Sequence, residues 1–115
     1  MATIEIVKPM TIEVDGTTYT LEFNRNSVMS AERAGLNIGE VQSAPMNTIP
    51  LLFYAAFKMH HPKVNREFTD HILFDVLGGL SESEFQRLAE LYAAPTNTLF
   101  RKESDGERKN VKVSL

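Results

Sequence analysis

Apolar and polar residues alternate along two short stretches near the start of the chain, residues 10–14 and 17–23. Asp15 and Gly16 lie between them, and this pair favours a two-residue β turn in which both positions take positive φ. Such a turn places three cross-strand pairs on one face: Val14 with Thr17, Ile12 with Tyr19, and Met10 with Leu21. The pattern therefore predicts an antiparallel hairpin whose apolar face must be covered by another element.

A first helix is predicted directly after the hairpin, over residues 27–34. Asn26 or Ser27 is expected to cap its N-terminus, and Gly35 to take the left-handed conformation after its end. Residues 36–45 lack a clear apolar period, and we expect a loop or a short irregular turn there.

A second helix is predicted over residues 48–60, where almost every interior side chain is apolar. Asn47 or Thr48 is expected to cap it, with Pro50 in the first turn, where a missing N–H does no harm. A helix that is apolar all round is normally buried on every side. Two interpretations follow: a central core helix, or a helix with part of its surface against another chain.

A third helix is predicted over residues 66–77, with Asn65 as its N-cap and Gly78-Gly79 at its end. Its apolar side chains spread over a wide arc at the helical period, with Phe74 beside the polar edge as a plausible contact residue. The members of the arc are Phe68, Ile72, Leu73, Val76 and Leu77.

The fourth helix has the clearest start, because Ser81 and Glu84 form the pattern of a capping box. Leu80 and Phe85 stand where a hydrophobic staple is expected, and Pro95 is expected to stop the helix.

These elements predict an α+β fold, in which an N-terminal antiparallel hairpin is packed by about four helices. Thr3–Val7 is a candidate third strand. Residues 1–100 are expected to form a single domain, and residues 101–115 a polar, flexible tail.

Composition agrees with one soluble globular domain. The chain has 115 residues, of which 43% are hydrophobic and 23% charged, and its net charge is −3. Residues 1–100 hold 7 basic and 12 acidic side chains, whereas residues 101–115 hold 5 and 3. A domain with a net negative charge does not supply the clustered positive field that nucleic-acid binding needs. No run of residues is long and apolar enough to span a membrane.

The chemistry in the chain favours a protein without catalytic function. The chain has no cysteine, which excludes a thiolate nucleophile and a metal site with cysteine ligands. No serine lies in a nucleophile elbow, and no glycine pattern cradles phosphate. We therefore expect no enzyme and no cofactor.

Histidines and carboxylates offer two weak metal-site candidates. The first is His60 and His61 together with His71, and the second is the stripe Glu67, His71 and Asp75, spaced four residues apart on one helix. The same spacing gives ordinary solvent-side pairs, which is the interpretation we prefer. We expect no bound metal.

Four segments carry a resemblance to small proteins encoded in the tail-gene clusters of siphophages and prophages. They are Tyr19-Thr20-Leu21-Glu22-Phe23-Asn24-Arg25, then Val28 with Glu32 to Gly35, then Leu52-Phe53-Tyr54-Ala55-Ala56-Phe57 through His60-His61-Pro62, and Leu88-Ala89-Glu90-Leu91-Tyr92. In size and layout the chain is similar to tail assembly chaperones.

The resemblance implies a protein that binds the phage tape measure protein in the cytoplasm of the bacterial host and keeps it soluble during tail assembly. It also implies a homo-oligomer, often with a longer frameshifted form. A tape measure is a long amphipathic helix, which an apolar groove or helix face can hold. The candidate partner-binding residues are Leu52, Phe53, Phe57, Phe74 and Leu77.

Two alternatives remain open from the sequence. The same five residues are also what a simple hydrophobic core would contain. In addition, nothing in the chain excludes a structural role as a tail or head–tail connector protein.

Overall fold

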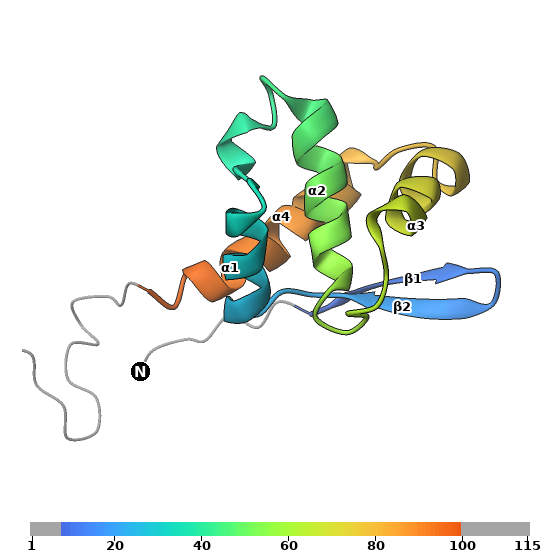
Figure 1. Cartoon of the computed structure of the whole chain (residues 1–115), viewed down its shortest axis with the longest axis horizontal. Coiled ribbons are helices and arrows are strands. Elements are labelled where there is room, and N and C mark those ends of the chain that lie inside the picture. The colour runs from blue at the N-terminus through green and yellow to red at the C-terminus, as the bar shows by residue number, and fades with distance from the viewer. Residues whose placement is uncertain (1–7, 100–115) are drawn as a thin grey trace, which may run out of the picture.

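The computed structural model describes residues 8–99, which fold into a two-stranded hairpin and a set of helices (Figure 1). Strands β1 (Met10–Val14) and β2 (Thr17–Leu21) are followed by helices α1 (Arg25–Arg33), η1 (Ile38–Glu40), α2 (Pro45–Phe57), α3 (Arg66–His71), η2 (Ile72–Val76) and α4 (Glu82–Thr96). The α+β architecture predicted from the sequence is confirmed. The candidate strand Thr3–Val7 and the tail from residue 101 lie outside the described residues.

The hairpin has the predicted register. Val14 pairs with Thr17, Ile12 with Tyr19 and Met10 with Leu21. Asp15 and Gly16 both have positive φ, 49° and 80°, as a tight turn of this kind requires. The apolar face packs against the helical core.

Helix α2 lies at the centre of the molecule, between α1 and α3, and α4 crosses behind it (Figure 1). It also contacts β2 and η1. Its apolar side chains therefore meet a neighbour in almost every direction, and Leu52, Phe53 and Phe57 are fully buried. Of the two interpretations of this helix, the structure supports the central core helix.

Two helix starts differ from the sequence prediction. Helix α1 begins after Asn24, whose side chain accepts from the Ser27 N–H at 2.7 Å, while the Ser27 hydroxyl accepts from the Asn24 N–H at 2.8 Å. Gly35 follows α1 with φ 98°, as predicted. Helix α2 begins at Pro45, not after Asn47 or Thr48.

Pro50 is consequently inside α2 rather than in its first turn. A proline there removes one backbone hydrogen bond of the helix. The loss of this hydrogen bond is offset by the burial of Pro50 and of the apolar residues that follow it, because neighbouring elements pack on most sides of α2.

The third predicted helix is two elements, α3 and a π turn, η2. Asn65 caps α3 as predicted, accepting from the Phe68 N–H at 2.8 Å. At the end of η2 the Leu77 N–H donates to the Ile72 carbonyl, five residues back, at 2.8 Å. Gly78 and Gly79 then end the segment with φ 69° and 102°.

Helix α4 begins at the predicted capping box, in which Ser81 and Glu84 each accept from the other's backbone N–H. Leu80 and Phe85 are both partly buried against the core, as a hydrophobic staple requires. The helix ends at Thr96, one residue beyond Pro95.

Candidate functional site

The π turn changes which side chains of the third helical segment face the core. Ile72 and Leu73 are buried, but Val76 is 49% exposed and Leu77 is 37% exposed. A π turn holds one more residue than an α turn, so the residues at its end are rotated away from the face that an α-helix would give them. Two members of the predicted apolar arc, Val76 and Leu77, therefore do not lie in the core, and for Leu77 this agrees with its choice as a candidate contact residue.

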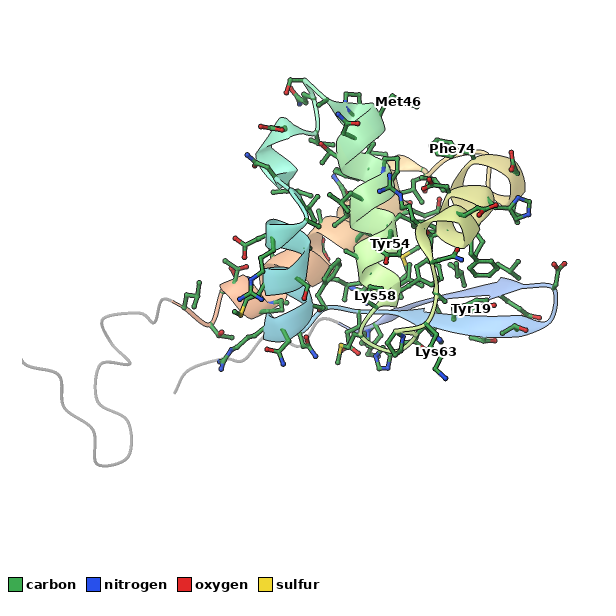
Figure 2. The ribbon with its side chains drawn as sticks, viewed as in Figure 1. Tyr19, Met46, Tyr54, Lys58, Lys63 and Phe74 are labelled. Carbon is green, nitrogen blue, oxygen red and sulfur yellow. The ribbon has the colours of Figure 1, made fainter. Side chains whose placement is uncertain are left out.

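Phe74 is exposed as well, at 46%, on the side of η2 away from the hairpin (Figure 2). Seven large apolar side chains are exposed in residues 8–99, and three of them lie within residues 74–77. A concentration of this kind is typical of a protein–protein contact, whereas single exposed apolar residues are ordinary.

Charged side chains surround Phe74. It lines a shallow depression together with Glu67, Asp70, His71 and Asp75. The His71 Nδ1 lies 2.9 Å from a carboxylate oxygen of Asp75, and the Arg66 Nε lies 2.9 Å from Asp70. We call Phe74, Val76 and Leu77, with the carboxylates of Glu67 and Asp75, the π-turn face.

The five candidate partner-binding residues divide into two groups. Phe74 and Leu77 are on the π-turn face. Leu52, Phe53 and Phe57 are in the core with no exposed area, so the expectation that they form a contact surface is corrected. The physical reason is the central position of α2, which places neighbouring elements over these side chains.

Sequence reasoning named Phe74 and Leu77 as contact candidates but placed Val76 only on the apolar arc, without a contact role. One signal was available, namely that the apolar arc of residues 68–77 is wider than a helix on the edge of a small domain can bury.

A second concave place is the groove between α1 and α2, with a volume of about 510 Å³. Ala31, Leu51, Tyr54 and Ala55 contribute to its walls. Its cation, Lys58, is already engaged: the Nζ donates to the Pro62 carbonyl at 2.6 Å and lies 5.2 Å from the centre of the Tyr54 ring (Figure 2). The Lys58 side chain thus ties the loop after α2 to the end of that helix. Met59, 36% exposed, is the one large exposed apolar side chain among the residues that line this groove, whereas three are gathered within residues 74–77.

The three histidines have separate roles. His60 pairs with Glu22 through its Nε2 at 2.7 Å, His61 accepts from the Thr20 backbone N–H, and His71 pairs with Asp75. Within residues 8–99, no group of three or more histidine or carboxylate side chains is arranged to hold a metal ion. In the same range no helix has the length and apolar content that crossing a membrane demands.

Comparisons with known proteins identify a family. No curated protein and no solved structure matches the chain. The model of a family described as a domain of unknown function, DUF5055, covers residues 1–115. The chain therefore belongs to the DUF5055 family.

Proposed function

We propose that this chain is a non-enzymatic chaperone of phage tail assembly, acting in the cytoplasm of the bacterial host. Its partner is the tape measure protein, a long amphipathic helix that aggregates when its apolar side is exposed to water. The resemblance of four segments to tail-cluster proteins motivates the identity of the partner. The exposed π-turn face is the observation that carries the binding function.

The chemistry of the π-turn face fits a helix rather than a small ligand. Phe74, Val76 and Leu77 protrude from a short turn and do not line an enclosed cavity. A partner helix that packs its apolar stripe against this turn removes exposed apolar surface from water. Complete burial of a fully exposed apolar side chain contributes roughly 1.5–3 kcal/mol. Phe74, Val76 and Leu77 are already more than half buried, so each can contribute less than half of that.

One such contact is too small for tight binding, because association also costs translational and rotational freedom. We propose that several copies of the chain bind along one tape measure and also contact one another. Many weak sites on one long partner give a high combined affinity.

Co-expression with a tape measure fragment tests the proposal. The parent chain is expected to keep the fragment in the soluble fraction, and Phe74→Gln with Leu77→Gln is expected to lose this effect. Met29→Gln is the matched control, because Met29 has the same 46% exposure but lies on α1. Equal protection by all three proteins would contradict the proposed surface, and no protection by the parent would contradict the function.

The alternative role as a tail or head–tail connector protein makes a different prediction. A chaperone leaves before the particle is complete, whereas a connector stays. Mass spectrometry of purified virions that finds the chain in stoichiometric amounts would therefore favour the connector.

A further inference from the structure

The π-turn face lies in the most acidic part of the described chain. Between Glu67 and Gln86 there are five carboxylates and no lysine or arginine. All of them are exposed or partly exposed. The five are Glu67, Asp70, Asp75, Glu82 and Glu84.

Neighbouring cations offset only part of this charge. Arg66 neutralises Asp70 through an ion pair of 2.9 Å. Asp75 has the imidazole of His71 as its partner, which carries a charge only when protonated. Glu67 forms no ion pair within residues 8–99. Phe74, the apolar side chain of the face that lines the depression, is therefore bordered by the negative charge of Glu67 and Asp75.

We infer that the π-turn face selects a helix with lysine or arginine beside its apolar stripe and disfavours one with acidic flanks. This inference rests on the proposed function and adds the charge of the partner to it. Phe74 contacts the apolar stripe of the partner, while Glu67 and Asp75, which line the same depression, attract cations beside it. Acidic side chains of a partner are repelled by these two carboxylates. The carboxylates therefore contribute mainly to the specificity of binding.

Two helical peptides of equal length test the inference. Both carry leucine at positions i, i+3, i+4 and i+7, and one has lysine flanks where the other has glutamate flanks. Fluorescence anisotropy with the full-length chain measures the affinity for each peptide. We expect the lysine peptide to bind about ten-fold more tightly at low salt, from two partly exposed charge contacts. The preference should shrink as salt screens the charges.

Variants locate the source of the preference. Glu67→Gln with Asp75→Asn should abolish most of the ten-fold ratio while both peptides still bind. The control, Glu13→Gln with Glu40→Gln, removes as many carboxylates from β1 and η1 and should leave the ratio unchanged. An equal fall in the ratio in both double variants would overturn the inference, because the overall charge of the chain would then be its source.

The peptides also separate this inference from the proposed function. If both peptides bind equally and Phe74→Gln weakens both, the helix-binding surface stands and the charge selection is wrong. If neither peptide binds in a way that depends on Phe74, the helix-binding surface itself is overturned, and the charge selection with it.

Discussion

The backbone N–H of Thr20 donates to the Nε2 of His61 at 2.9 Å, joining the outer edge of β2 to the segment that follows α2. The neighbouring outward N–H, that of Glu22, donates to the Ala56 carbonyl near the C-terminus of α2 at 3.0 Å. Two N–H donors on the free edge of the hairpin are thus satisfied by the end of α2 and by the segment that follows it. An uncovered edge exposes donors and acceptors that can pair with other chains.

We predict that His61→Ala lowers the free energy of unfolding by roughly 1–3 kcal/mol, because the partly buried Thr20 N–H loses its acceptor. The ring also packs edge-on against Tyr19, with centroids 5.1 Å apart. Urea denaturation followed by circular dichroism measures the change. His60→Ala is the control and should cost about 0–1 kcal/mol, since its pair with Glu22 is partly exposed. Equal losses in both variants would contradict the importance of the Thr20 bond.

Replacing Phe53 and Phe74 by alanine should have opposite consequences for folding and binding. Phe53→Ala opens a cavity in the core and is expected to cost about 3–5 kcal/mol of stability. Phe74→Ala removes an exposed ring and should change stability by about 0.5 kcal/mol or less.

Thermal denaturation of both variants checks this difference. Because Phe53→Ala can fail to fold, Phe53→Leu serves as a milder second variant and should still be less stable than Phe74→Ala. A Phe74→Ala protein as unstable as either would show that Phe74 belongs to the core.

The turn of the hairpin should tolerate change at one of its two positions. Gly16→Ala puts a Cβ on a residue at φ 80°, and we expect a loss of roughly 1–2 kcal/mol from backbone strain. No atom lies within 4 Å of the added Cβ, so a steric clash does not contribute. Asp15→Asn keeps a residue type that accepts positive φ and should be nearly neutral. Denaturant midpoints for the two variants test the difference, and a neutral Gly16→Ala would contradict it.

Alkaline pH should destabilise the fold through Tyr92. Burial, and then the charge of Glu32, raise the pKa of the Tyr92 hydroxyl above its ordinary value of 10.0. Above that pH the unfolded chain releases this proton while the folded chain keeps it, so the unfolded state binds fewer protons and stability falls as pH rises.

Comparison of Tyr92→Phe with the parent isolates this contribution. The variant should lose less stability than the parent as the pH is raised above 10.0, because phenylalanine has no proton to release. Glu32→Gln should also reduce the loss of stability at high pH, but by less than Tyr92→Phe. It removes only the charge that raises the pKa of Tyr92 and leaves the effect of burial in place. Parallel pH profiles for Tyr92→Phe and the parent would contradict the assignment.

The sequence by itself determined the features that depend on neighbouring residues. The hairpin register follows from Asp15-Gly16 and the alternation on each side, and the start of α4 follows from Ser81 and Glu84. These contacts join residues only a few positions apart, so propensity and side-chain chemistry suffice to predict them.

Only the tertiary structure decided which apolar side chains are exposed. Periodicity groups apolar residues on one face but does not say what covers that face. Phe53 and Phe57 are buried because β2, α1, α3 and α4 all pack on α2, whereas Val76 and Leu77 are exposed because the chain forms a π turn before Gly78. The packing of distant elements sets both outcomes, and the candidate site follows from them rather than from any local motif.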